Sequence, residues 1–98
     1  MNASVAIQVL PRVSTDEETV RAVDRVIAYI KSFGLHTEVG PFETTVEGDY
    51  DQLMEIVRGC PLVCAREGVP GVMTYVKISY CPGGVMTMEG KTAKHRKA

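Results

Sequence analysis

The chain has 98 residues, of which 45% are hydrophobic and 23% are charged, and its formal net charge is −1. That length predicts one domain over residues 1–98, and the charge balance gives no reason to expect binding to nucleic acid or to an anionic membrane. No apolar run is long enough to span a membrane. The three cysteines are an odd number, which favours a reducing compartment over a disulfide scaffold, so we expect a cytoplasmic protein.

The first two elements are a strand and a helix. Residues 4–10 are rich in β-branched side chains and predict a strand that Pro11 ends. Apolar residues then recur at helical spacing and predict a helix near 16–33, with Gly34 as its left-handed C-terminal cap. Two capping-box patterns stand at the start of this helix, Ser14 with Glu17 and Thr15 with Glu18.

A second helix is expected over residues 49–66. Asp49 with Gln52 is a capping pattern at its start, and Gly68 is placed to close it. Pro61 lies inside this helix, where it removes one backbone hydrogen bond and crowds the carbonyl of the preceding turn. We therefore expect a kink or a break at this proline.

The remaining segments predict strands. Residues 35–39 and 42–47 flank a Gly-Pro turn and predict an antiparallel hairpin, and residues 72–80 alternate as a long final strand. Residues 85–88 are interpreted as a short extra edge strand, followed by a loose or helical basic tail. The tail carries Lys91, Lys94, His95, Arg96 and Lys97, and it is interpreted either as a small anion-binding patch or as a solvated terminus.

The order strand, helix, strand, strand, helix, strand predicts an α+β fold, the ferredoxin-like βαββαβ sandwich with both helices on one face of an antiparallel sheet. The other face stays open and mixes small, apolar and polar groups. Such a face is most simply covered by a second copy, so we expect a homodimer or homotetramer. The residues expected on the open face are Ala6, Gln8, His36, Glu38, Glu43, Thr45, Glu47, Met73, Tyr75, Lys77 and Ser79.

Patterns typical of catalysis or metal binding are weak. Cys60 and Cys64 share a helical stripe, but no second Cys or His pair at ligand spacing accompanies them, so buried structural thiols are favoured over zinc. His36 and His95 belong to no nucleophile motif. We expect no enzyme, no metal and no cofactor.

Two other functions of this fold also fit poorly. An acylphosphatase would have an arginine in a glycine-rich loop after the first strand, whereas residues 11–14 read Pro-Arg-Val-Ser. An RNA-recognition domain would have aromatic platforms on its central strands, and here only the last strand offers any, Tyr75 and Tyr80.

Residues 40–49 are the most informative segment. They place hydroxyls, carboxylates and glycines together at a strand and a helix start. Thr45 and Glu47 are two residues apart, so they project from one sheet face towards Gln8 and Lys77. From the residues alone, a well-made strand-to-helix junction remains the alternative to a binding site.

Residues 40–49, together with 4–11, 28–35 and 76–79, resemble the thiamine-binding protein family. The likeness covers nearly the whole chain and departs from the family at Gly59-Cys60-Pro61 and in the basic tail. It implies a ferredoxin-like protein that forms dimers or pairs of dimers. It also implies binding of thiamine, or of its hydroxymethyl-pyrimidine part, without catalysis.

The resemblance gives the open face a ligand. Glu47 or Gln8 would accept from the pyrimidine amino group, and Thr45 would donate to a ring nitrogen. Glu38 or Glu43, with the ring of Tyr75 or Tyr50, would stabilise the thiazolium charge. The ligand-binding residues expected are Gln8, Glu38, Glu43, Thr44, Thr45, Glu47, Tyr75 and Lys77. The alternative function is an interaction module that uses the open face for self-assembly without a ligand.

Overall fold

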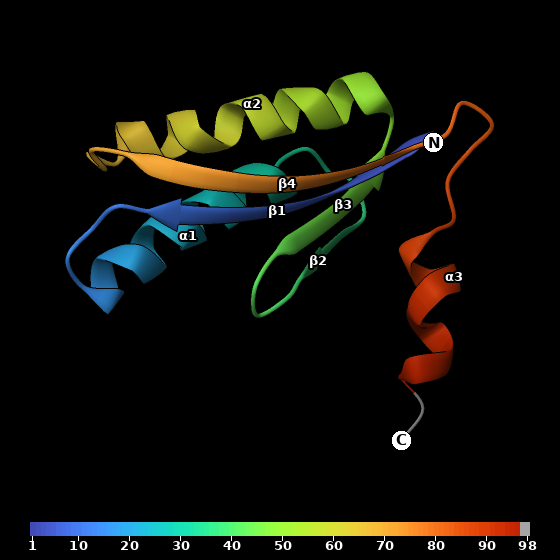
Figure 1. Ribbon diagram of the computed structural model, residues 1–98, viewed down its shortest axis with the longest axis horizontal. Helices are drawn as coiled ribbons and strands as arrows, with labels where there is room; N and C mark the ends of the chain where they lie inside the picture. The colour runs from blue at the N-terminus through green and yellow to red at the C-terminus, as the bar shows by residue number, and fades with distance from the viewer. Residues whose placement is uncertain (97–98) are drawn as a thin grey trace.

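The computed structural model describes residues 1–96, so Lys97 of the basic tail lies outside it. The elements are β1 (Ala3–Pro11), α1 (Asp16–Lys31), β2 (Thr37–Val39), β3 (Thr44–Gly48), α2 (Tyr50–Arg66), β4 (Val72–Tyr80), α3 (Met88–Thr92) and a 3₁₀ helix (Ala93–His95). The strands form one antiparallel sheet in the order β2-β3-β1-β4, and α1 and α2 lie on one side of it (Figure 1). The predicted α+β, ferredoxin-like fold is confirmed.

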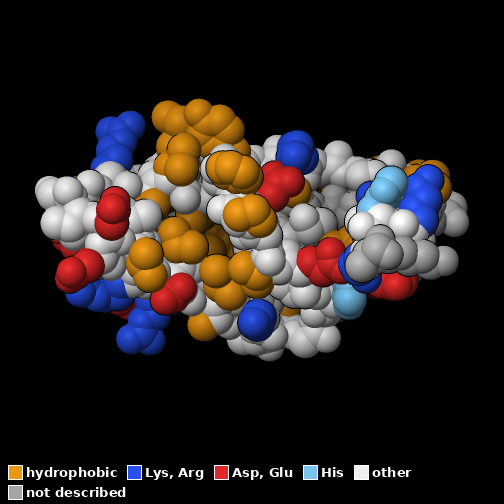
Figure 2. Space-filling view, turned by 90° about the horizontal axis from the view of Figure 1, so that it is seen from below, with side chains coloured by type: hydrophobic (Ala, Val, Ile, Leu, Met, Phe, Trp, Pro, Cys, Tyr) orange, Lys and Arg blue, Asp and Glu red, His pale blue; other side chains and the backbone are white. Residues whose placement is uncertain are grey.

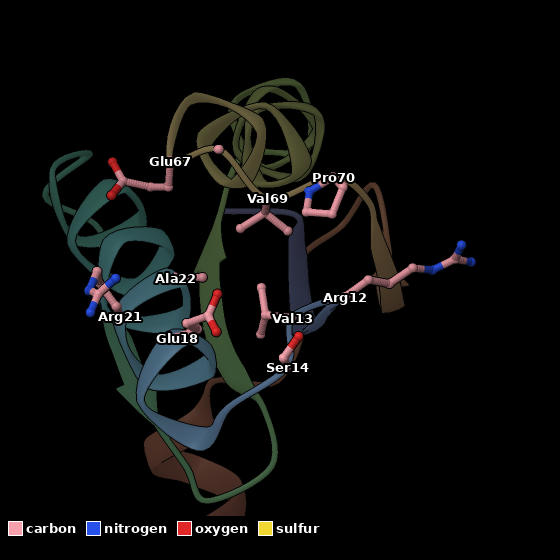
Figure 3. A pocket seen from close by; sticks show the side chains of 10 residues that line it. Arg12, Val13, Ser14, Glu18, Arg21, Ala22, Glu67, Val69 and Pro70 are labelled. Carbon is pink, nitrogen blue, oxygen red and sulfur yellow. The ribbon is translucent and has the colours of Figure 1, made fainter.

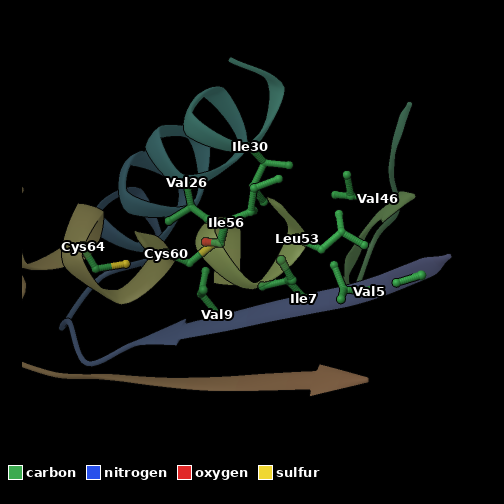
Figure 4. Close-up of a cluster of buried hydrophobic side chains, with 11 residues drawn as sticks. Val5, Ile7, Val9, Val26, Ile30, Val46, Leu53, Ile56, Cys60 and Cys64 are labelled. Atoms are coloured by element: carbon green, nitrogen blue, oxygen red, sulfur yellow. The ribbon is translucent and has the colours of Figure 1, made fainter. Parts of the chain in front are cut away.

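The core fills the space between the sheet and the two long helices (Figure 4). Alternate residues of β1 point into it, as strand geometry requires. Burial of each such side chain contributes about 1.5–3 kcal/mol to stability, so this layer holds the sheet in place. The largest fully buried side chains are Ile30, Leu53, Ile56, Val5, Val46, Cys60 and Cys64.

The starts of the two long helices are capped differently. Thr15 caps α1, because its hydroxyl accepts from the Glu18 N–H at 3.1 Å, which selects the second of the two predicted capping boxes. Asp49 stands at the predicted N-cap of α2, but its side chain makes no capping bond. The Asn2 side chain accepts from the Tyr50 N–H instead, at 2.9 Å, so the predicted capping bond of Asp49 is wrong.

Helix α2 runs without interruption from Tyr50 to Arg66, so the predicted break at Pro61 is wrong. The physical reason is that α2 buries a full apolar side against the sheet, which offsets one lost backbone bond. Gly59 brings the two long helices close together, because a Cβ there would overlap the hydroxyl of Tyr29. That hydroxyl donates to the Glu55 carbonyl across the helix pair at 3.3 Å.

The C-terminal segment lacks the predicted edge strand and takes the helical alternative expected for the tail. Residues 85–87 have no regular structure and Met88–Thr92 form α3, so the predicted edge strand over 85–88 is not formed. Thr87 starts this helix, since its hydroxyl accepts from the Gly90 N–H at 2.9 Å. Figure 1 shows α3 beyond the end of the strands, apart from α1 and α2. It therefore lies at a corner of the sheet and not along its edge.

Candidate functional site

The open face of the sheet carries a continuous row of side chains from all four strands. Glu38 of β2 stands opposite Thr45 of β3, which stands opposite Ala6 of β1, which in turn stands opposite Lys77 of β4. Three of the predicted site residues thus share one line across the sheet. Their positions are set by the register, which the buried opposite face fixes.

The neighbouring rows hold other predicted site residues. Gln8 pairs with Tyr75 on one side of the central row, while Glu47 pairs with Ser4 on the other. Glu43 precedes β3, and its carboxylate reaches the ammonium group of Lys77 at 3.1 Å. Seven of the eight predicted residues therefore lie on or beside this face.

Thr44 is the residue that the structure does not bring there. It pairs with Ile7, whose side chain is in the core, and only 6% of Thr44 is exposed. Alternation along the strand separates it from Thr45, because neighbouring side chains point to opposite faces. Thr44 therefore faces the helices, away from the other seven residues.

Two adjacent hollows open on this face. The hairpin hollow, about 290 Å³, is formed by the β2–β3 connection and has the polar side chains of Glu38, Glu43 and Thr45 in its lining. The lysine hollow, about 280 Å³, is lined by Ser4, Val5, Ala6, Glu43, Thr45, Lys77, Ile78, Ser79 and Lys91. Because Glu43 and Thr45 line both, the two hollows lie side by side. Gln8, Glu47 and Tyr75 belong to neither lining.

The C-terminal segment meets two of the predicted carboxylates. Glu47 accepts from the Met88 N–H at 2.9 Å, and Glu38 accepts from the Arg96 guanidinium at 2.6 Å. Arg96 also reaches Glu89 at 2.6 Å. Hydrogen bonding and charge from Glu89, together with the nearby Glu38, raise the pKa of Arg96 above its ordinary value. The segment from Met88 to Arg96 is thus fastened to the open face at its start and at its end.

Sequence reasoning missed this contribution of the tail. It left Met88, Lys91 and Arg96 out of the site because it placed an edge strand at residues 85–88 and interpreted the basic residues either as an anion-binding patch or as a solvated terminus. A usable signal was present, since three glutamates were expected on the open face and a cluster of basic residues lies at positions 91–97. Opposite charges on two segments of one chain favour their contact, although each exposed pair contributes little.

Two further hollows lie on other parts of the molecule. One, about 170 Å³, lies between the connectors that follow β1 and α2; Figure 3 shows the side chains of Val13 and Val69 towards it, while Arg12 and Arg21 point away. Its lining also includes the polar residues Ser14, Glu18 and Glu67. The other, about 190 Å³, is lined mainly by apolar residues of α1, β1 and the hairpin loop, with the predicted residues Gln8, Glu43 and Thr44 also in its lining. Figure 2 shows apolar side chains gathered around a hollow on the side of the molecule seen from below.

Within residues 1–96, no group of three or more His, Cys, Asp or Glu side chains is arranged to hold a metal ion. Cys60 and Cys64 are buried free thiols of the core. Burial raises the pKa of Cys60 to about 12, with a smaller contribution from Cys64, so its sulfur stays protonated and donates to the Ile56 carbonyl at 3.2 Å. No helix in the described part of the chain is both long and apolar enough to cross a membrane.

Comparison with known proteins agrees with the resemblance noted in the sequence. The chain is 47% identical over 93 residues to a UPF0045 protein of Clostridium perfringens, covering 95% of this chain and 96% of that protein. A DUF77 domain from Bacillus cereus, of unknown function, superimposes with a TM-score of 0.88 at 31% identity, covering 98% of this chain and 91% of the other.

A Thermotoga maritima protein, for which a part in thiamine biosynthesis or salvage has been suggested, has a similar structure. It superimposes with a TM-score of 0.87 at 33% identity, covering 98% of this chain and all of that one. The model of the family described as thiamine-binding protein matches residues 5–96. The chain therefore belongs to the thiamine-binding protein family.

Proposed function

We propose that this protein is a non-catalytic binding protein for thiamine or its hydroxymethyl-pyrimidine moiety, with the ligand held on the open sheet face. The observation that carries the proposal is the pair of adjacent hollows at Glu43 and Thr45, in a chain of this family. Ligand sites combine a preformed concave surface with a few placed polar groups, and these hollows have both.

The hairpin hollow suits an aminopyrimidine ring. Such a ring has a donor amino group and acceptor nitrogens. The carboxylates of Glu38 and Glu43 offer acceptors, and the hydroxyl of Thr45 offers a donor. The same carboxylates would offset the positive charge of a thiazolium ring. We therefore assign the recognition of the pyrimidine to these three side chains.

The predicted residues Gln8 and Tyr75 would reach the ligand through a second copy of the chain. Leu10, Met73 and Tyr75 are apolar side chains on the open face with 43%, 47% and 55% of their surface exposed. Covering them with the same face of a partner would bury this apolar surface and would bring Gln8 and Tyr75 over the ligand. We propose that the protein is a homodimer, or a pair of dimers, in this way.

Calorimetric titration with thiamine and with hydroxymethyl-pyrimidine tests the proposal. Thr45→Val removes the donor with little change in shape, and the expected result is about a tenfold loss of affinity. Thr19→Val, the same exchange on α1, is the matched control and should bind like the unaltered protein. Absence of heat with both ligands, or an unchanged affinity for Thr45→Val, would contradict the proposal.

A second candidate function is self-assembly without a ligand. The exposed apolar side chains of Leu10, Met73 and Tyr75 on the open face favour it. It predicts that Tyr75→Ser dissociates the oligomer while neither ligand changes the assembly. Sedimentation with and without ligand separates the two candidates.

The free thiols in the described chain suit the reducing cytoplasm, which we propose as the compartment of this protein.

A further inference from the structure

We propose that the lysine hollow is a phosphate subsite, so that the preferred ligand is a phosphate monoester of the pyrimidine alcohol. This inference rests on the proposed function and names the ligand class for the same site. It goes beyond the pyrimidine ring, because it assigns the neighbouring hollow and a residue of the C-terminal segment to the ester group.

Two ammonium groups converge on this hollow from different parts of the chain. Lys77 comes from the last strand and Lys91 from α3, and both line it. The hydroxyl-bearing residues Ser4, Thr45 and Ser79 line it as well. A phosphate monoester carries a charge of about −1.5 to −2 near neutral pH and has three acceptor oxygens. Point charges from lysine and neutral hydroxyl donors are suitable partners for such a group.

The charge balance favours an anion. Glu43 is the one carboxylate in the lining, and the ammonium group of Lys77 lies 3.1 Å from it. The lining is therefore net positive, since two ammonium groups face one carboxylate. The position of Lys91 depends on the fastening of the tail, in which Arg96 donates to Glu38 and the Met88 N–H donates to Glu47. These contacts hold α3, and Lys91 with it, beside the sheet.

The hairpin hollow lies next to the phosphate subsite, so one ligand can occupy both. Glu43 and Thr45 line both hollows, so a ring in one and a phosphate in the other are separated by little more than these two side chains. A single methylene ester link suits so short a separation. The structure thus assigns the ring and the ester to adjacent positions of one ligand.

The test is calorimetry with three probes, hydroxymethyl-pyrimidine, its phosphate monoester and inorganic phosphate. The unaltered protein should bind the monoester at least about tenfold more tightly than the alcohol, because charge-assisted hydrogen bonds are the stronger ones. Lys91→Met should remove most of this preference and leave the affinity for the alcohol unchanged. Lys77→Met should remove more, because it also leaves the Glu43 carboxylate facing the phosphate.

Lys94→Met is the matched control, since Lys94 is an exposed lysine of the same tail that does not line the hollow. It should keep the full preference for the monoester. The preference should also shrink as salt rises, because exposed charges are screened. Equal affinity for alcohol and monoester, or an equal loss in Lys91→Met and Lys94→Met, would overturn the inference and leave the proposed function standing. Failure of the alcohol and the monoester to bind would overturn both, and tight binding of inorganic phosphate alone would replace this ligand class by a simple anion site.

Discussion

The two faces of the sheet are built on different principles. The helix-side face is mainly apolar, and α1 and α2 bury Val5, Ile7 and Val46 almost completely, while Ile78 and Tyr80 at the end of β4 stay 49% and 53% exposed. The open face mixes carboxylates, hydroxyls and a lysine with exposed apolar side chains, and α3 lies against part of it, where Met88 meets Glu47 and Lys91 lines the lysine hollow. The first face stabilises the fold by burial. The second leaves polar groups available at fixed spacing, which is what a binding surface requires.

The largest expected effect separates the two faces by one exchange made on each. Leu53 is fully buried on the helix side, whereas Leu10 is 43% exposed on the open side. In protein diluted to the monomer, Leu53→Ala should lower the free energy of unfolding by about 2–5 kcal/mol, and Leu10→Ala by about 1 kcal/mol or less. Urea denaturation measures both. Equal losses in the monomer would mean that one chain by itself buries the open face as deeply as the core.

A second effect concerns the close approach of the two long helices. Gly59→Ala would place a methyl group on the Tyr29 hydroxyl, at a cost of about 1–3 kcal/mol for overpacking. That cost exceeds the gain of about 1 kcal/mol from replacing glycine by alanine in a helix. Thermal unfolding should therefore show a net loss.

Gly83→Ala is the control for this exchange, because a Cβ at Gly83 meets no atom within 4 Å. Its stability should stay near that of the unaltered protein. In a Tyr29→Leu background, Gly59→Ala should change the thermal stability little, since the overlapping ring is gone. Destabilisation by Gly59→Ala of the same size in both backgrounds would show that the contact with Tyr29 is not the cause.

The cysteines report on burial through their protonation. In the native protein at pH 8 a thiol reagent should modify the exposed Cys81 quickly and reach Cys60 and Cys64 only after unfolding.

In the folded protein the pKa of Cys60 is raised from 9.0 to about 12. As the pH rises, the Cys60 thiol therefore loses its proton in the unfolded chain before it does so in the folded one. Stability should therefore be unaffected by this group below pH 9 and should fall between pH 9 and 12.

Chemical denaturation across that pH range checks the sign of the effect. Cys60→Ala should be less stable at neutral pH, because it leaves a small cavity, but its stability should fall less steeply above pH 9. A slope identical to that of the unaltered protein would show that another group controls the alkaline transition.

The smallest effect on global stability is expected at the open face. Arg96→Met breaks the contacts of the tail with Glu38 and Glu89, both of them exposed or half-exposed. Surface ion pairs add little, so the unfolding midpoint should barely move. Amide hydrogen exchange of the Met88 N–H should nevertheless become faster, because the segment is released. An unchanged exchange rate at this amide would show that the bond to Glu47 holds α3 without Arg96.

The helix-side architecture was predictable from local patterns. Apolar periodicity fixed α1 and α2 to within about two residues at each end, and Gly34 and Gly68 do adopt positive φ angles after them, 71° and 82°. The last strand, Val72–Tyr80, has the predicted bounds. Periodicity succeeds here because each element buries one face, and burial dominates the energy.

The failures share another cause, which is contact between segments distant in the chain. Asn2 replaces Asp49 as the capping side chain because β1 begins beside the start of α2. The tail folds as α3 because Thr87 caps it and Glu47 accepts from its first N–H. Thr87 is a local signal for this helix start, whereas the contact with Glu47 comes from a segment 41 residues away. The position of Thr44, by contrast, followed from alternation alone.

The central claim is that the open face, between the hairpin and the tail, holds the ligand. Two-dimensional NMR of the amide groups during titration with hydroxymethyl-pyrimidine tests this most directly. The signals of Glu38, Glu43 and Thr45 should shift together and saturate at one affinity, with smaller changes at Lys77. Shifts confined to the hollow around Val13 and Val69, or no shifts at saturating ligand, would contradict it.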